Sequence, residues 1–374
     1  MGSNSVEIAK VESNKEIREF IKFPWKVYKG DQYWVPPLIV DMKNMMDRDK
    51  CPFFEHSEAD FFLARRNGET VGRIAAILNN RHNLVHNDNI GFFGFFEALN
   101  DADVAERLLD TACEWCRKKG LSRIRGPMNY SQNDTCGLLV DGFDSSPVVL
   151  MTYNPKYYEN LFEEIGLTKV MDLYAYYLSA DKKMPDRLIR IAERLKKEIE
   201  VTIRPIDMKD FWGEVERVKA VYNAAWAPNW GFVPLTDSEI KHLAIELKPA
   251  IDPDIVFMAE HKGNPVGFSL ALPDFNMAIK HANGRLFPTG LLKILWNKRK
   301  INGVRVIIMG VIPEYQKRGI DSVFYWETYR IGVNKGYRWG EFSWILENNV
   351  MMNRAARMMG AHVYKTYRVY EKEL

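Results

Sequence analysis

The fold follows from one stretch, VRVIIMGVIPEYQKRGID, which covers residues 304–321. Its first half is rich in Val, Ile and Met, which is typical of a strand that is buried on both faces. Pro313 ends that strand, a short turn leads to Gly319, and a helix begins near Asp321. The first N–H groups of a helix lack partners, and the helix dipole is positive there. The stretch therefore predicts an anion site, and a phosphate-bearing ligand is the first to expect.

Length and composition restrict the class of protein. The 374 residues exceed one average domain and predict two, of about 150–200 residues each. Hydrophobic residues make up 47% of the chain and charged residues 27%, so both halves can bury a core. The net charge of +3 is too small to indicate a nucleic-acid partner. We expect a cytoplasmic protein, because cysteines are few and neither a signal peptide nor a membrane-spanning segment is indicated.

Metal binding is not expected from the cysteines and histidines. Cys113 and Cys116 form a lone C-x-x-C inside a helical pattern, so a structural role is favoured over a metal or redox role. His82 and His86 are four residues apart, but no third ligand follows nearby.

The chain contains an internal repeat. The hairpins expected at 61–78 and 255–272 match without a gap, at a constant offset of 195 positions. The matching residues are Phe62, Ala64, Gly68, Val71, Gly72 and Ala76 in the first and Phe257, Ala259, Gly263, Val266, Gly267 and Ala271 in the second. Each half has the order strand, helices, hairpin, strand, helix, strand, helix, strand. We therefore predict an α/β fold (α+β, with a mixed sheet) that is present twice, at 1–180 and 201–374, with a connecting helix at 181–200.

The turn after the buried strand carries a family resemblance. Residues 313–320 read PEYQKRGI, behind a hairpin and between a strand and a helix. Asn349 begins a further helix, which Gly360 and Ala361 close. This arrangement resembles the GNAT N-acyltransferases, in which Gln/Arg-x-x-Gly-x-Gly/Ala joins the fourth strand to the next helix and binds acyl-CoA. The resemblance covers residues 201–374 directly and the first half through the repeat. It implies two tandem acyl-CoA N-acyltransferase-like domains.

The resemblance also implies a donor site for acetyl-CoA or a longer acyl-CoA in the second half. In such folds the fourth strand separates from the fifth, and its free backbone groups pair with the pantetheine amides as an added strand would. The N–H groups of the turn hold the pyrophosphate, the glycine permits close approach, and basic side chains supply counter-charge. The donor-binding residues expected are Met309, Val311, Gln316, Lys317, Arg318, Gly319, Ile320, Asp321 and Asn349.

The sequence departs from the family's pattern at two positions. Asp321 stands where the family has Gly or Ala. A carboxylate suits the first turn of a helix but repels a nearby diphosphate, so it either points away and caps the helix or alters donor binding. The family's general-acid tyrosine on the last helix falls at Ala356. The proton for the leaving thiolate must then come from another group or from water.

Candidate catalytic residues follow from these departures. Glu347 comes directly after the strand expected at 339–346 and is the acid nearest to the expected cleft, so it is the candidate general base. Tyr364, Tyr367 and Tyr370 on the last strand are candidates for the proton donor, and we select Tyr367. The alternatives are a helix-start role for Glu347 and packing roles for the tyrosines.

Three further segments bear on ligands and partners. Residues 97–101 lead directly into a helix without a basic, glycine-bearing turn, so the first half lacks the pyrophosphate loop and should not bind CoA. The polar loop at 129–135 either presents acceptor-binding groups or is a surface loop. Residues 286–300 are apolar and end in a basic cluster. Core packing with a solvated basic end is favoured there over a cap on a long acyl chain or a weak membrane-surface contact.

The expected activity is N-acyl transfer from acyl-CoA to a small-molecule amine or an amino-acid-like acceptor, with no nucleic acid as partner. The resemblance implies direct attack of a neutral amine on the thioester, with the enzyme positioning both partners and handling one proton on each. One alternative is a transferase that uses acyl-carrier-protein or aminoacyl-tRNA donors. Another is a degenerate protein that binds acyl-CoA as a sensor, which Asp321 and Ala356 favour.

Overall fold

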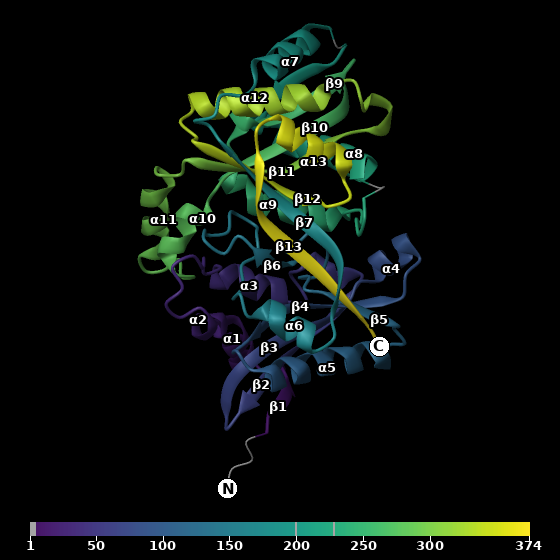
Figure 1. Ribbon diagram of the computed structural model, residues 1–374, viewed down its shortest axis with the longest axis vertical. Coiled ribbons are helices and arrows are strands. Elements are labelled where there is room, and N and C mark those ends of the chain that lie inside the picture. Colours follow the sequence, from purple (N-terminus) through teal and green to yellow (C-terminus); the bar gives the residue numbers. More distant parts are fainter. Residues whose placement is uncertain (1–4, 199, 227–228) are drawn as a thin grey trace. The chain divides into compact units, whose positions relative to one another are not determined.

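The computed structural model describes residues 5–198, 200–226 and 229–374 (Figure 1). Contacts between residues group the chain into two compact units. The first unit consists of Met1–Leu173, Ile279–Ile294 and Lys365–Leu374, and the second unit consists of Tyr174–Ala278 and Leu295–Tyr364. Each unit therefore includes a segment from the other half of the sequence. The division into two domains joined by a helix follows the sequence repeat and stays a prediction.

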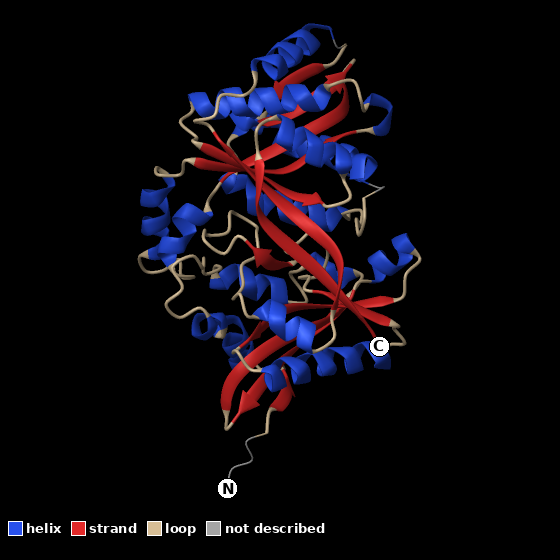
Figure 2. Ribbon diagram, in the orientation of Figure 1, coloured by secondary structure: helices blue, strands red, loops and turns tan. Residues whose placement is uncertain are grey.

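The first unit is built on a mixed sheet (Figure 2). Its strands follow the order β1-β2-β3-β4-β5-β13, and β6 also pairs with β13. Neighbours in this sheet are antiparallel, except that β4 and β5 are parallel. The strands are β1 (Glu7–Lys10), β2 (Glu58–Arg66), β3 (Glu69–Leu78), β4 (Ile90–Ala98), β5 (Arg123–Gly126), β6 (Leu138–Asp141) and β13 (His362–Glu373).

The helix α5 (Ala102–Lys118) closes the core of the first unit by packing along β2 and β3 (Figure 1). The Asp101 side chain accepts a hydrogen bond from the N–H of Val104 and so caps the helix. Val104, Leu108 and Ala112 recur at helical spacing and are buried, as the sequence predicts. The other helices are α1 (Asn14–Lys22), α2 (Pro24–Val27), α3 (Ile39–Met46), α4 (Asn80–His86), α6 (Tyr158–Glu164) and the 3-10 turn η1 (Pro52–Glu55).

The paired cysteines lie on the buried face of α5. Burial raises the pKa of Cys113 to about 11 and the pKa of Cys116 to about 12. Both thiols therefore stay protonated and unreactive at neutral pH, which supports a structural role. Among the described residues, no group of three or more His, Cys, Asp or Glu side chains is placed to hold a metal ion.

The second unit is built on a sheet of the same kind. Its strands follow the order β7-β12-β11-β10-β9-β8. The pairs β8–β9, β9–β10 and β10–β11 are antiparallel, whereas β11 and β12 are parallel. The strands are β7 (Thr168–Ser179), β8 (Thr202–Pro205), β9 (Val256–His261), β10 (Asn264–Pro273), β11 (Gly303–Val311) and β12 (Trp339–Leu346).

Helices cover both faces of the second sheet, as the alternation of side chains along β9 demonstrates. Phe257 packs with Phe324 of α12 (Ile320–Asn334), whereas its neighbour Met258 packs with Tyr222 of α8 (Phe211–Trp226). The remaining helices in this half of the sequence are α7 (Asp186–Glu198), α9 (Asp237–Leu247), α10 (Asn276–Ile279), α11 (Gly290–Lys298) and α13 (Val350–Met358), with the 3-10 turns η2 (Met208–Asp210), η3 (Lys248–Ala250), η4 (Pro253–Ile255), η5 (Lys280–Ala282) and η6 (Pro313–Tyr315). Of these, η5 and the part of α11 up to Ile294 are grouped with the first unit.

The two units repeat one pattern, which confirms the predicted tandem fold with mixed α/β sheets. In the first unit the hairpin β2–β3 leads to β4, α5 and the parallel strand β5. In the second unit the hairpin β9–β10 leads to β11, α12 and the parallel strand β12. A helix that connects two parallel neighbouring strands is the crossover expected of such a unit.

The interpretation of residues 286–300 as a core segment is wrong. They form the helix α11 with its preceding turn, and Phe287, Leu292 and Trp296 are exposed rather than packed. An apolar helix is buried only if segments far apart in sequence pack over it. The sequence repeat does not indicate whether any segment packs over α11. No helix in the described chain is long and apolar enough to cross a membrane.

Candidate functional site

The central feature of the second unit is a fork between β11 and β12. β11 pairs with β10 as far as Val311, but with β12 only over Gly303 to Val306. Beyond Val306 the described residues show no further pairing between β11 and β12. Residues 307–310 are accordingly half-buried, whereas the paired residues before them are buried. The fork leaves one edge of β11 open to a ligand that can hydrogen-bond as a strand does.

A buried polar network lies at the base of the fork. Arg305 of β11 donates from Nε to Ser343 Oγ at 2.9 Å and from a terminal nitrogen to the Ser343 carbonyl at 3.2 Å. The Glu341 carboxylate accepts hydrogen bonds from Ser343 Oγ and from the Tyr364 hydroxyl. Arg305 and Glu341 face each other in the strand register, and both are almost fully buried. Hydrogen bonds on all sides allow such charges to remain inside the protein.

A turn with two left-handed residues follows the open edge. η6 leads through Lys317, whose φ is +61°, to Gly319, whose φ is +85°, and α12 begins directly after it. Left-handed residues next to a helix start turn successive N–H groups toward one side, which makes a concave anion site. The sequence predicts this turn and places the helix start within one residue of the observed position.

The polar side chains of the turn are exposed, but two of them have partners within it. Gln316 donates from Nε2 to the Val311 carbonyl at 3.1 Å, so it reaches back to the open edge of β11. Arg318 donates to the Glu314 carbonyl at 3.0 Å and lies 4.7 Å from the centre of the Tyr315 ring. Arg318 is thus held at the turn although its guanidinium faces solvent.

The helix α7 packs beside α12 and its turn (Figure 1). Lys196 of α7 forms an ion pair of 2.8 Å with Glu327 of α12. A Cβ atom at Gly319 would lie 2.4 Å from Cδ1 of Leu195. The left-handed φ therefore favours glycine at this position, and a Cβ there would also require the Leu195 side chain to move.

Asp321 lies half-buried in the first turn of α12. Burial raises the pKa of its carboxyl group above the ordinary value, although the backbone N–H groups of Ser322 and of Asp321 itself lower it. The residue at the N-cap is Gly319, so Asp321 acts as a first-turn residue rather than as the cap. A partly buried carboxylate thus interacts with the N–H groups of Asp321 and Ser322, which directly follow the turn.

Sequence reasoning missed Tyr325, which lies one turn after Asp321. The buried Tyr325 packs in a cluster with Met309 of β11, Phe342 of β12 and Met352 of α13, so it lies where the fork opens. Its hydroxyl donates to the Met352 sulfur at 3.3 Å. Burial, with the charge of Asp321 as a smaller cause, raises the pKa of Tyr325, so its proton is retained at neutral pH. The four-residue spacing from Asp321 was the available signal, because such residues share one face of a helix.

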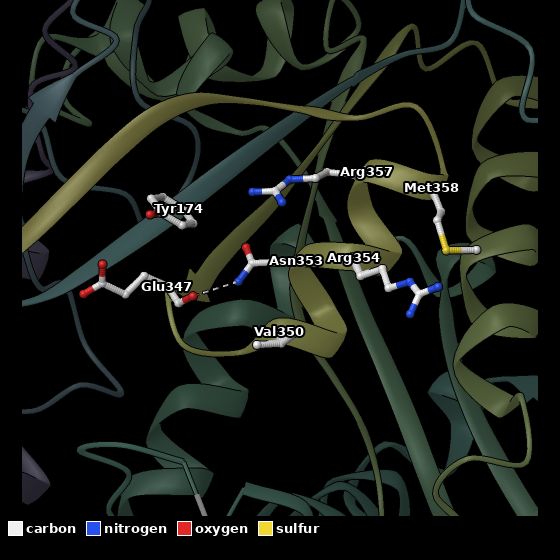
Figure 3. A pocket seen from close by; sticks show the side chains of 7 residues that line it. All are labelled: Tyr174, Glu347, Val350, Asn353, Arg354, Arg357 and Met358. Atoms are coloured by element: carbon white, nitrogen blue, oxygen red, sulfur yellow. Dashed lines mark hydrogen bonds between the residues drawn. The ribbon is translucent and has the colours of Figure 1, made fainter.

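A separate polar pocket lies along α13 (Figure 3). Its volume is about 560 Å³, and its lining residues are Tyr174, Glu347, Val350, Asn353, Arg354, Arg357 and Met358. The Glu347 carboxylate points away from α13, while its backbone carbonyl accepts a hydrogen bond of 3.4 Å from Asn353 (Figure 3). The pocket combines one acid with two arginines, so it can orient a polar or anionic group.

Asn349 caps α13, because its side chain accepts a hydrogen bond of 3.1 Å from the N–H of Met352. Met352 and Ala355 lie on the helix face that packs with Met309, whereas Arg354 belongs to the opposite face, which lines the pocket. Ala356 is buried, so a tyrosine in its place would have to displace core side chains. The expected donor-binding role of Asn349 and the catalytic role of Glu347 stay predictions.

The chain is similar to known proteins over almost its whole length. It is 36% identical to the bacterial ceramide synthase of Caulobacter vibrioides, with 99% of this chain and 98% of that protein covered. It is 34% identical to protein YghO of Escherichia coli, with 97% and 94% covered. A solved tandem GNAT protein from the clavulanic acid biosynthesis pathway has a TM-score of 0.58 at 11% identity, with 99% of this chain and 98% of that chain covered. No protein-family model matches the chain.

The chain belongs to the same family as the bacterial ceramide synthase and protein YghO, and its fold is that of the tandem GNAT proteins. The predicted tandem GNAT-type fold is thereby confirmed.

The fork of the first GNAT unit is filled by the chain itself. β4 and β5 pair only as far as Phe92 and Arg125, and beyond them the loop after β5 pairs with β4. The N–H of Met128 donates to the Phe93 carbonyl at 2.8 Å, and the N–H of Phe95 donates to Asn129 Oδ1 at 2.8 Å. The side-chain amide of Asn129 thus holds the position at which the edge of β4 could receive a ligand amide.

The polar loop at 129–135 is therefore more than a surface loop. Tyr130 is buried, stacks on Phe53 with ring centres 4.4 Å apart, and donates to the Met45 carbonyl at 2.6 Å. Asn129 donates in turn to the Thr135 hydroxyl at 2.7 Å. The loop acts as a plug, which supports the prediction that this GNAT unit does not bind CoA.

Tyr367 lies in the first GNAT unit and is buried in its core. It pairs with Leu139 across β13 and β6, and its Cβ would approach a Cβ at Gly137 to 3.0 Å. The donor turn belongs to the second GNAT unit. The catalytic role of Tyr367 stays a prediction, for which this packing offers no support.

The substitution Gly319→Ala tests the tight approach of α7 to the turn. A left-handed φ costs a residue other than glycine about 1–2 kcal/mol, and the new Cβ would also contact Leu195. We expect the free energy of unfolding, measured by urea denaturation, to fall further than in Gly336→Ala. Gly336 is the matched control because its φ is +93° and its Cβ would meet nothing within 4 Å. Adding Leu195→Ala should recover part of the extra loss, whereas equal losses in both glycine variants would contradict the contact.

Proposed function

We propose that this protein transfers an acyl group from acyl-CoA to an amine, with the donor bound at the fork of the second GNAT unit. The observation that carries the proposal is the open edge of β11 leading directly into the left-handed turn and the start of α12. An extended amide chain and a diphosphate, in that order, are what such a surface complements. In the first GNAT unit the corresponding edge is taken up by the chain itself, so one donor site is proposed.

The orientation of the β11 backbone supports the predicted contacts to pantetheine. The N–H of Ile312 donates to the Val266 carbonyl of the hairpin at 2.9 Å. Because successive residues of a strand direct their main-chain groups to opposite edges, those of Met309 and Val311 face away from β10. The Val311 carbonyl already accepts from Gln316, so the Val311 N–H and both Met309 groups are proposed to bind the pantetheine amides.

The turn is proposed to bind the pyrophosphate. The N–H groups of residues 317–320 lie at the start of α12, where the helix dipole favours an anion. Lys317 and Arg318 are exposed cations of the turn and supply counter-charge. Gly319 permits the close approach of a phosphate oxygen, and Ile320 donates its N–H from the first position of the helix.

The reaction is proposed to be direct acyl transfer. The amine nitrogen attacks the thioester carbonyl carbon, the C–N bond forms, the C–S bond breaks, and CoA leaves as a thiolate that takes up one proton. Glu347 is proposed to accept the proton of the amine, because it directly follows β12, the strand that separates from β11 at the fork. Tyr325 is proposed to hydrogen-bond the leaving sulfur, because its hydroxyl is protonated, contacts Met352 of α13, and belongs to a side chain in the same cluster as Met309 of the fork.

The substrates are proposed to be a long-chain acyl-CoA and a long-chain amine. The support is the 36% identity over almost the whole length to a protein named bacterial ceramide synthase. Ceramides are amides of a fatty acid and a long-chain amino alcohol, so their synthesis by N-acyl transfer needs these two reactants. Acetyl-CoA and an amino-acid-like acceptor are the alternatives to exclude.

The transfer assay compares acyl donors and acceptors directly. We expect release of free CoA thiol from palmitoyl-CoA in the presence of a sphingoid base, with no release above background when acetyl-CoA or a hydrophilic amine replaces either reactant. Thiol release is followed with a chromogenic disulfide, and the amide product by mass spectrometry. Calorimetric CoA binding without turnover on a broad amine panel would favour an acyl-CoA sensor. If CoA does not bind but acyl groups are transferred from acyl-carrier-protein, that protein carries the acyl donor.

Two substitutions test the proton-handling groups. Tyr325→Phe and Glu347→Gln should each lower kcat by about 10²–10⁴-fold, the range typical of general acid–base residues, without weakening CoA binding. Tyr329→Phe is the matched control, because Tyr329 lies one turn further on the same helix and its hydroxyl contacts the Lys182 carbonyl at 3.4 Å. A kcat that is unchanged in Tyr325→Phe would remove the proposed role of that hydroxyl.

Asp321→Asn tests whether the carboxylate opposes the donor diphosphate. Removing about 1 kcal/mol of repulsion at a helix start should tighten the Kd for CoA by roughly threefold to tenfold, as measured by calorimetry. Asp237→Asn should leave that Kd unchanged, because Asp237 is an exposed first-turn residue of α9. Weaker CoA binding by Asp321→Asn would mean that the carboxylate instead holds the turn in its binding conformation.

A further inference from the structure

The helix α11, labelled in Figure 1, presents an apolar face to solvent. The side chains of Leu292, Leu295 and Trp296 are 67%, 55% and 67% exposed, and Leu291 is 43% exposed. Phe287, in the turn before the helix, is 77% exposed. At 100° per residue the four helix residues fall within one face of α11. Single exposed apolar residues are ordinary, but this contiguous set of large ones on one short helix requires a partner.

The opposite face of α11 attaches the helix to the protein. Gly290 and Asn297 are buried there, and a Cβ at Gly290 would lie 1.6 Å from the Arg285 carbonyl oxygen. The two buried residues of α11 are therefore small or polar, with the half-buried Ile294 beside them, whereas its exposed side is large and apolar. An ordinary surface helix has the reverse arrangement.

The segment that carries α11 has charges of one sign. Residues 275–313 contain no Asp or Glu, and six of the seven Lys and Arg residues in that range lie at 280, 285, 293, 298, 299 and 300. Lys293, Lys298, Arg299 and Lys300 are exposed at the sides and the end of the helix. An apolar aromatic face bordered by cations matches a surface that is apolar beneath and anionic above.

We propose that α11 docks this protein on the surface of an anionic lipid bilayer, with the apolar face in the boundary between headgroups and acyl chains. Leu291, Leu292, Leu295 and Trp296 enter that boundary, together with Phe287 from the preceding turn, while the basic side chains contact anionic headgroups. This is a peripheral contact, since the helix spans nine residues and a bilayer core requires about 20.

A bilayer fits this face better than a second copy of the chain does. A symmetric contact through α11 would bring together two segments whose charges are all positive. One face of a nine-residue helix also falls short of the roughly 20–30 residues that each partner of a stable dimer contributes. An anionic membrane attracts the basic side chains and does not need a large protein interface.

Vesicle co-sedimentation of the full chain tests the proposal. We expect binding to vesicles of phosphatidylglycerol and phosphatidylcholine in equal parts, weakening as salt is raised, and little binding to phosphatidylcholine alone. The double variant Leu292→Asp, Trp296→Asp should lower the partition coefficient by about tenfold or more. The matched control is Leu84→Asp, Val85→Asp, which replaces two adjacent exposed apolar residues of α4 and should bind as the parent does.

All four replaced side chains are exposed, so both double variants should fold. Their melting temperatures verify this. Equal sedimentation of the parent with and without phosphatidylglycerol, or undiminished binding by the α11 variant, would overturn the proposal. Light scattering on a sizing column tests whether a second copy of the chain occupies the face instead. If the parent is a dimer that fails to bind vesicles and the α11 variant is a monomer, a second copy occupies this face and the bilayer proposal is wrong.

Discussion

β11 and β12 hydrogen-bond along Gly303 to Val306 and then separate, and the donor-side features of the second unit depend on that separation. The point of separation coincides with a buried network in which Arg305, Ser343 and Glu341 satisfy one another. Charged groups remain inside a protein only when hydrogen bonds replace their water. The network therefore fixes the paired part of the two strands, and the strand edge beyond it stays open.

The two units differ in what lies along the open strand edge at the fork. A strand edge inside a fold must have its N–H and C=O groups paired with something. In the first unit the loop after β5 supplies the pairing, through Met128 and the side-chain amide of Asn129. In the second unit the edge from Ile307 to Gly310 stays half-buried and is followed by the glycine turn. A duplicated fold can thus keep one copy as a scaffold while the other retains the edge on which the proposed donor binds.

The elements that carry the site were largely predictable from the sequence. The hairpins, the helix after Asp101, the strand at 339–346 and the turn at Gly319 all follow local rules, because periodicity, caps and left-handed glycines act over a few residues. The family motif indicated the donor turn for the same reason. Tyr325 escaped this reasoning because a tyrosine on a largely buried helix has the same local pattern whether its hydroxyl faces a fork or the core.

The sequence by itself determined the repeat, the order of strands and helices apart from short elements such as α4 and β6, and the presence of a phosphate-type turn in the second half only. The tertiary structure alone decided that residues 365–374 belong to the first unit, that Asn129 plugs its fork, and that α11 exposes its apolar face. The physical reason is the distance along the chain between the partners. Strand pairing, burial and plugging depend on contacts between residues far apart in sequence, and no local pattern of residues encodes which distant segment supplies the contact.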